Sequence, residues 1–269
     1  MTGAMENARF LECLEADFWR FREVVPGRLE GRVPSCPDWT VTDLTRHVAE
    51  VYLHKVEMMR HGAHPEGWPP AAFLEEEPVG LLTRGYGELR AEFDARKPED
   101  ASKTWYEPDQ TVGFWVRRMA QETVIHRIDA ELGAEAPIAP VPDDLAVDGV
   151  DELLKVFVAY AFSKWPEDFT EALKNSPGHA FLIRTDATNN SPSVSWLVRT
   201  AADRLTVAGG PGEKADGMVT PDVTISGTPT AILRWAWNRE TPGEASPVRI
   251  EGNAEALTEF RQCVVEATQ

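Results

Sequence analysis

The sequence CPDWTVTDLTRH, residues 36–47, encodes the start of a helix and places a histidine two turns into it. Thr40 can cap the first turn, and Asp43, three residues later, can complete a capping box. Trp39 stands before the cap, where an apolar side chain packs back onto the helix as a staple. His47 is therefore expected to project from a helix whose first turn is well defined.

A second stretch, WVRRMAQETVIHRID at residues 115–129, predicts a helix that can face the first one. Glu122 and His126 are four residues apart, so both side chains leave the same face and can converge on one ion. Asp129 follows His126 by three residues and can hold its imidazole as an outer-sphere hydrogen-bond acceptor. A surface carboxylate is the alternative interpretation of Asp129.

Together His47, Glu122 and His126 offer two imidazoles and one carboxylate. Such a set suits tetrahedral Zn²⁺ with a fourth position open to water or substrate. It also admits iron, manganese or nickel, because nitrogen and oxygen ligands discriminate weakly among these divalent ions. Spacing alone leaves another interpretation open, since a Glu-x-x-x-His pair on a helix is common and a lone histidine often fills a core.

Apolar residues recur with a helical period from about residue 4 to about residue 165, and the segments between these stripes are rich in Pro and Gly. An antiparallel bundle is the simplest arrangement, with its last helix at residues 145–165. After about residue 170 the segments become short and β-branched, which predicts an antiparallel sheet with two helices, an α+β module. We expect two domains, a metal-binding bundle at residues 1–168 and the α+β module at residues 169–269.

The chain has 269 residues and a net charge of -17, which disfavours binding to nucleic acids and to anionic lipid surfaces. It contains no apolar run long enough to span a membrane and begins without a signal-peptide pattern, so we expect a cytoplasmic protein without a membrane partner. The three cysteines lack metal-cage or disulfide spacing. Cys36 precedes a helix and is interpreted as a structural thiol rather than a nucleophile.

The two stretches quoted above resemble the mycothiol-dependent maleylpyruvate isomerase family, whose N-terminal domain is a DinB-like four-helix-type bundle. Downstream, DVTISG at residues 222–227, ILRWAWNR at residues 232–239 and VRIEGN at residues 248–253 look like that family's C-terminal domain, which is sterol carrier protein-like. The resemblance covers nearly the whole chain.

The resemblance implies that His47, Glu122 and His126 are zinc ligands, with water as the fourth. It also implies that Arg239 acts in catalysis and cofactor binding by reaching toward the metal from the second domain. Mycothiol or a related low-molecular-weight thiol would be the cosubstrate, and a small electrophile the substrate. The oligomeric state is expected to be a monomer or a small homo-oligomer.

The expected function is a zinc- and thiol-dependent S-transferase or a thiol-assisted cis-trans isomerase. A zinc hydrolase that uses metal-bound water is one alternative, and a non-enzymatic small-ligand binding protein is another. Three further side chains can lie at the site. His54 shares the face of His47, although a packed or solvent-facing histidine is the simpler interpretation. Arg117 and Arg118 can pair with the cofactor's carboxylate or with Glu122, although surface ion pairs on the helix are the commoner outcome.

Overall fold

The computed structural model describes residues 5–169, 173, 176–202, 204–215 and 219–268. The chain divides into two compact units. One is Glu6–Ala139, and the other is Pro140–Gln269 together with Met5. Each unit has its own core, and the expected order, a helical domain followed by an α+β domain, is confirmed.

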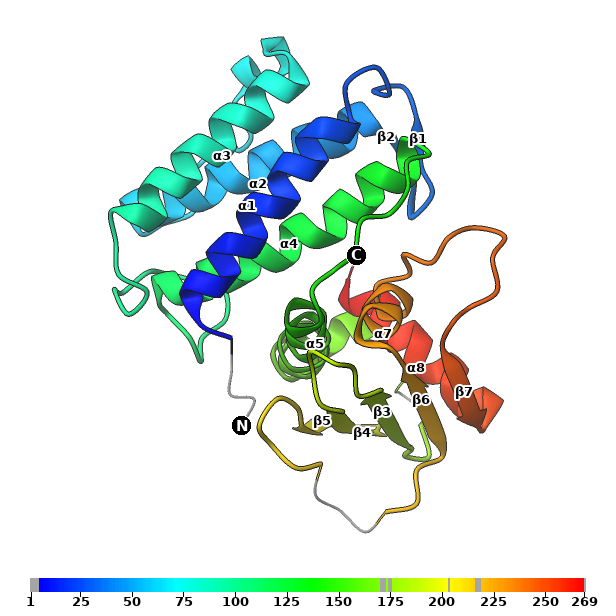
Figure 1. The fold of residues 1–269 in the computed structure, drawn as a ribbon. Helices are drawn as coiled ribbons and strands as arrows, with labels where there is room; N and C mark the ends of the chain where they lie inside the picture. The colour runs from blue at the N-terminus through cyan, green and yellow to red at the C-terminus, as the bar shows by residue number, and fades with distance from the viewer. Residues whose placement is uncertain (1–4, 170–172, 174–175, 203, 216–218, 269) are drawn as a thin grey trace. The chain divides into compact units, whose positions relative to one another are not determined.

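Four long helices build the first unit: α1 (Asn7–Val24), α2 (Val41–His61), α3 (Pro78–Asp94) and α4 (Val112–Gly133). Helix α2 packs on α3 and α4, and α1 packs on α4 (Figure 1). A hairpin of β1 (Arg32–Val33) and β2 (Cys36–Thr40) leads into α2, and a short 3-10 helix, η1 (Ala71–Glu75), interrupts the loop before α3. The hairpin was not among the elements expected from the sequence.

The expected capping box at the start of α2 is present. The backbone N of Asp43 donates to the Thr40 hydroxyl at 3.2 Å, and the backbone N of Thr40 donates to the Asp43 carboxylate at 2.8 Å. The helix ends at Gly62, whose positive φ of 66° closes the last turn without a Cβ penalty. These local signals define α2 and hence the direction in which His47 leaves it.

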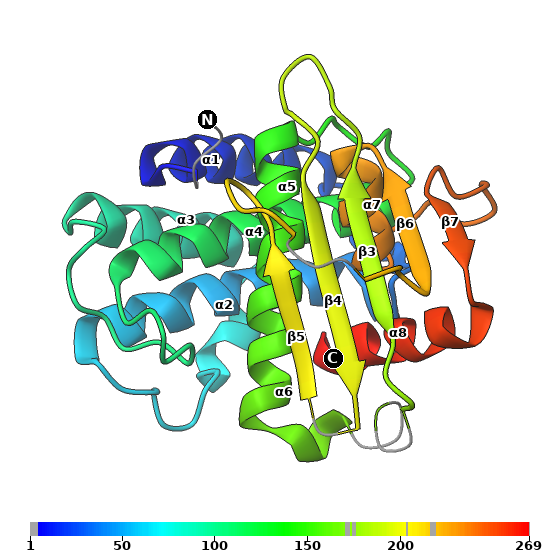
Figure 2. The ribbon, with the colours of Figure 1, turned by 90° about the horizontal axis from the view of Figure 1, so that it is seen from below.

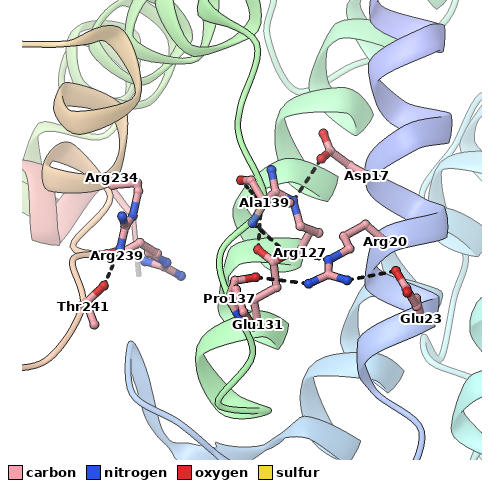
Figure 3. A network of polar contacts seen from close by, with 10 residues as sticks. All are labelled: Asp17, Arg20, Glu23, Arg127, Glu131, Pro137, Ala139, Arg234, Arg239 and Thr241. Atoms are coloured by element: carbon pink, nitrogen blue, oxygen red, sulfur yellow. Dashed lines mark hydrogen bonds and ion pairs between the residues drawn. The ribbon is translucent and has the colours of Figure 1, made fainter.

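A buried ionic network fixes α4 against α1 (Figure 3). The Arg127 side chain has no exposed surface, and its Nε donates to Asp17 at 3.0 Å on α1. One Nη of Arg127 donates to Glu131 at 2.7 Å and to the Ala139 carbonyl at 2.9 Å. Arg20 donates to the other carboxylate oxygen of Glu131 at 2.8 Å. Buried charges require such partners, so this network constrains the position of α4.

The second unit contains a five-stranded sheet in the order β5-β4-β3-β6-β7. The strands are β3 (Ala180–Thr185), β4 (Ser195–Ala201), β5 (Arg204–Gly209), β6 (Val223–Gly227) and β7 (Arg249–Gly252). Helices α5 (Asp143–Glu152), α7 (Pro229–Ala236) and α8 (Ala254–Ala267) cover one face of the sheet (Figure 2).

The prediction of a purely antiparallel sheet was wrong, because β6 pairs with β3 in parallel. After the β3-β4-β5 meander the chain returns to the open side of β3 instead of adding a strand beyond β5. This places the apolar side chains of Val223 and Ile225 in the buried centre of the sheet. The sheet is therefore mixed.

The helix expected at residues 145–165 is present but belongs to the second unit. It consists of α5, a π-helical segment η2 (Leu153–Tyr160) and α6 (Ala161–Lys164) in direct succession, followed by a 3-10 turn, η3 (Pro166–Phe169). Helix α5 packs on α7, and Trp196 of β4 donates its indole N–H to Asp151 at 3.0 Å. The division between the units thus follows Ala139, well before the boundary expected between residues 168 and 169.

No helix in the described ranges is long and apolar enough to cross a membrane.

Candidate metal centre

The three candidate ligands converge between α2 and α4. One Glu122 oxygen, Oε1, lies 3.4 Å from Nε2 of His47 and 3.2 Å from Nε2 of His126. The candidate ligand atoms of the three residues all lie within 4.8 Å of one another. Ligands held about 2.0–2.1 Å from a tetrahedral zinc ion are separated by about 3.3 Å, so the two distances from Glu122 Oε1 match those expected around one ion.

Hydrogen bonds outside the donor set orient two of these side chains. Arg118, one turn before Glu122 on α4, donates to Glu122 Oε2 at 2.7 Å and leaves Oε1 facing the imidazoles. Asp129 Oδ2 lies 2.9 Å from Nδ1 of His126. Because a carboxylate accepts a hydrogen bond, Nδ1 of His126 carries the proton, and the lone pair of Nε2 faces the shared centre in the neutral imidazole.

The site is held in a partly desolvated environment. His126 and Glu122 side chains are 11% and 17% exposed, whereas that of His47 is 36% exposed, so solvent reaches the group from the His47 side. Burial lowers the pKa of His126, but the carboxylates of Glu122 and Asp129 outweigh this effect and raise the pKa to about 9. Burial raises the pKa of Glu122, yet His126, His47 and Arg118 together hold it well below its usual range.

Two neighbouring side chains complete the surroundings of the donor set. The Trp39 ring lies against His47, with the ring centroids 4.8 Å apart. Lys55 lies two turns after His47 on α2, with its ammonium group 5.0 Å from the centroid of the Trp115 ring. Burial lowers the pKa of Lys55 to about 8, although the charge of Glu122 acts in the opposite direction. No sequence pattern singled out Lys55, since an isolated lysine on a helix is ordinarily exposed.

Of the further side chains considered from the sequence, Arg118 pairs with Glu122 as described. His54 is half-buried and lies 3.2 Å from the Lys55 amine and 3.3 Å from His64, measured between nitrogen atoms. These contacts place His54 in a polar group with Lys55 and His64 rather than in the donor set. Cys36 is half-buried in the hairpin and is not part of the candidate ligand group.

Arg239 lies in the second unit, in the turn that follows α7. Its backbone N donates to the Arg234 carbonyl at 2.7 Å, and Nε of Arg234 donates to the Arg239 carbonyl at 2.9 Å. Arg234 also donates to the Thr241 hydroxyl at 3.0 Å (Figure 3). One Nη of Arg239 donates to the Trp237 carbonyl at 2.5 Å. The backbone of Arg239 is thus well supported, and its action on the metal centre stays a prediction.

The fold and the donor set define a two-domain protein with a helical bundle, a candidate metal centre between two of its helices, and an α+β unit with a mixed sheet. The chain belongs to the mycothiol-dependent maleylpyruvate isomerase (MDMPI) family. Residues 11–131 match the mycothiol maleylpyruvate isomerase N-terminal domain, and residues 144–259 match the MDMPI C-terminal domain. The family expected from the sequence is therefore confirmed.

A solved structure shares the fold of the whole chain. A histidine-to-alanine mutant of mycothiol-dependent maleylpyruvate isomerase shares 16% identity with a TM-score of 0.54, and the alignment covers 90% of this chain and 96% of that chain. Sterol carrier protein domain 2 of Helicoverpa armigera shares 16% identity over 48% of this chain and 94% of its own, with a TM-score of 0.32, too low to support an argument. Curated proteins yield no match.

Proposed function

We propose that this protein is a metal- and thiol-dependent enzyme that uses mycothiol, or a related low-molecular-weight thiol, in an S-transfer or cis-trans isomerisation of a small electrophile. The observation that carries the proposal is the convergence of His47, Glu122 and His126 on one point. Membership of a family named for a mycothiol-dependent isomerase supports the choice of thiol chemistry.

Zinc is the proposed ion, because two imidazoles and one carboxylate on helices form the usual donor set of a zinc site with an open position. A divalent ion bound there stabilises the thiolate form of a bound thiol near neutral pH. The protein's residues supply the remaining requirements. Glu122 offers Oε1 to the site while Arg118 holds its other oxygen, and Asp129 fixes the His126 ring.

The chain's own cysteines are poor candidates for the reacting sulfur. Cys13 and Cys263 are buried, and burial raises the pKa of the Cys263 thiol to about 12. The candidate ligand group contains histidine and glutamate alone. A separate thiol is therefore the proposed nucleophile, which agrees with the cosubstrate in the family's name.

Arg239 is proposed to bind a carboxylate of the substrate or negative charge that develops during the reaction. Guanidinium groups form strong, charge-assisted hydrogen bonds with such anions. Two hydrogen bonds between Arg234 and Arg239 support this role, because they hold the turn that carries the Arg239 side chain: the Arg239 backbone N donates to the Arg234 carbonyl, and the Arg234 guanidinium donates to the Arg239 carbonyl.

Metal analysis of the purified protein tests the first part of the proposal. We expect one equivalent of zinc in the wild type and in His61→Ala, a matched control whose histidine is 67% exposed and pairs with Glu57. We expect zinc to be lost in His47→Ala. A metal-free wild type that retains its turnover would overturn the proposal.

Incubation of zinc-loaded protein with mycothiol and a panel of electrophiles, including cis-configured conjugated acids, tests the second part. Consumption of thiol indicates transfer, and isomerised product without net thiol loss indicates isomerisation. Turnover that proceeds without any thiol would contradict the proposal and favour hydrolysis by metal-bound water.

A further inference from the structure

The β1-β2 hairpin reaches the candidate metal centre through a residue that belongs neither to the donor set nor to its immediate hydrogen-bond partners. Ser35 stands in the turn between the two strands, and its hydroxyl donates a hydrogen bond to Oδ1 of Asp129. The other oxygen of Asp129 accepts from Nδ1 of His126 at 2.9 Å. A continuous chain of hydrogen bonds thus runs from the hairpin to a candidate ligand.

Both oxygens of Asp129 are engaged in this chain, and the residue has no exposed surface. Loss of a hydrogen bond to a buried carboxylate costs free energy, so each donor favours the orientation in which its bond is made. The Ser35 hydroxyl donates to Oδ1 while Nδ1 of His126 donates to Oδ2. The Ser35 hydroxyl therefore favours the orientation of Asp129 in which Oδ2 meets His126.

The hairpin is itself held firmly against the helices that carry the site. The backbone N of Val41, the first residue of α2, donates to the Gly31 carbonyl at 2.8 Å. A Cβ atom on Gly31 would lie 2.2 Å from the Gly133 carbonyl oxygen at the end of α4, so only glycine allows this approach. Ser35 is consequently presented by a segment that is docked on both α2 and α4.

The same hairpin also contacts the other candidate histidine ligand. Trp39 lies at the end of β2 with its ring centroid 4.8 Å from that of His47. Ser35 acts on His126 through Asp129, and Trp39 packs directly on His47. The two imidazoles, which come from different helices, are thus steadied by one short segment.

We infer that Ser35 is a positioning residue of the metal centre, which fixes His126 through Asp129 so that its Nε2 lone pair is aimed at the bound ion. This inference rests on the proposed function, since it assumes that His47, Glu122 and His126 bind a metal. Partners outside the ligand shell of a metal-binding histidine typically change metal affinity by about 10–100-fold. Ser35 is one hydrogen bond further from the ion than Asp129, so we expect its loss to change zinc affinity by about tenfold, the lower end of that range.

The test is a competition titration of Zn²⁺ against a chromophoric chelator, with the whole chain as wild type, Ser35→Ala, Ser35→Thr and Ser163→Ala. We expect Ser35→Ala to bind zinc about tenfold more weakly than wild type and Ser35→Thr to recover most of the affinity, because threonine keeps the hydroxyl. Ser163→Ala is the matched control, since the Ser163 hydroxyl donates to a backbone carbonyl in the other unit, and it should bind as wild type does.

A double-mutant cycle shows whether Ser35 acts through Asp129. Asp129→Ala alone should weaken binding at least as much as Ser35→Ala, and the double variant should bind no more weakly than Asp129→Ala. The absorption spectrum of the Co²⁺-loaded protein should shift in Ser35→Ala and remain that of the wild type in Ser163→Ala. Thermal unfolding of the metal-free variants confirms that each is folded.

The outcomes separate this inference from the proposal on which it rests. Wild-type protein that binds no metal would overturn the proposed function. Wild-type protein that binds zinc, with Ser35→Ala binding equally well, would overturn the role of Ser35 alone. Additive losses in the double variant would show that Ser35 does not act through Asp129 and would overturn the inference as well.

Discussion

Replacement of Arg127 by methionine should destabilise the helical unit strongly, because the substitution removes the cation that pairs with Asp17 and leaves Glu131 with Arg20 alone. Arg127 has no exposed surface and pairs with Asp17 at 3.0 Å and with Glu131 at 2.7 Å. Removal of one partner from a buried ion pair costs about 3–5 kcal/mol. In a unit of this size, that loss lowers the midpoint of thermal unfolding by roughly 10–20 °C.

Thermal and urea unfolding followed by circular dichroism provide the measurement, and Arg20→Met is the control. Arg20 also pairs with Glu131, but its side chain is 28% exposed and Glu131 keeps Arg127. We expect the control to lose about 1 kcal/mol. If Arg127→Met were no less stable than Arg20→Met, the network would not stabilise α4, and the reasoning would be refuted.

The loss of unfolding free energy in Arg127→Met should also depend on pH. Burial raises the pKa of Asp17 from 3.8 to about 6 even though Arg127 opposes this shift. A carboxyl whose pKa is higher in the folded than in the unfolded protein favours folding at low pH, and this contribution disappears as the pH rises through the folded pKa. Without Arg127 the pKa of Asp17 rises further, so the variant should regain stability relative to the wild type as the pH falls toward about 6, where Asp17 of the wild type becomes protonated as well.

Three further predictions concern the same unit. Burial lowers the pKa of Lys55 from 10.5 to about 8. The unfolding free energy of the wild type should therefore rise by up to about 3 kcal/mol as the pH is raised from about 8 to 10.5. Lys55→Met should lack this rise, and equal pH slopes in urea titrations would contradict the assignment. Thr40→Ala should lose about 1 kcal/mol with the cap of α2, and Thr40→Ser should retain it, as thermal unfolding would show. Gly133→Ala should cost about 1–3 kcal/mol in the same assay, because its Cβ would lie 2.8 Å from a Val41 methyl group, whereas Gly87→Ala meets nothing within 4 Å and should cost nothing.

Two parts of the candidate site could be predicted from local rules. The capping box sets the start of α2, and the four-residue spacing puts Glu122 and His126 on one face. That the face of α4 meets His47 required the family resemblance, since helical spacing says nothing about which helices pair. The position of Asp129 against His126 followed from a spacing of three residues on one helix.

Features that depend on distant segments were missed or misplaced. Ser35 and Asp129 are 94 residues apart, and no local pattern connects a turn serine with a helical aspartate. The parallel pairing of β3 with β6 likewise depends on where a long connection returns to the sheet. The apolar pattern of residues 145–165 predicts a helix but cannot indicate whether the bundle or the sheet receives it.

All three candidate ligands, together with Asp129 and Ser35, lie within Glu6–Ala139. The candidate ligands are therefore all encoded in the first half of the gene. Substitutions in Pro140–Gln269 do not alter these residues. If the proposed ion binds to the candidate ligands, substitutions in the second half, including Arg239, can change substrate preference while these ligands are retained.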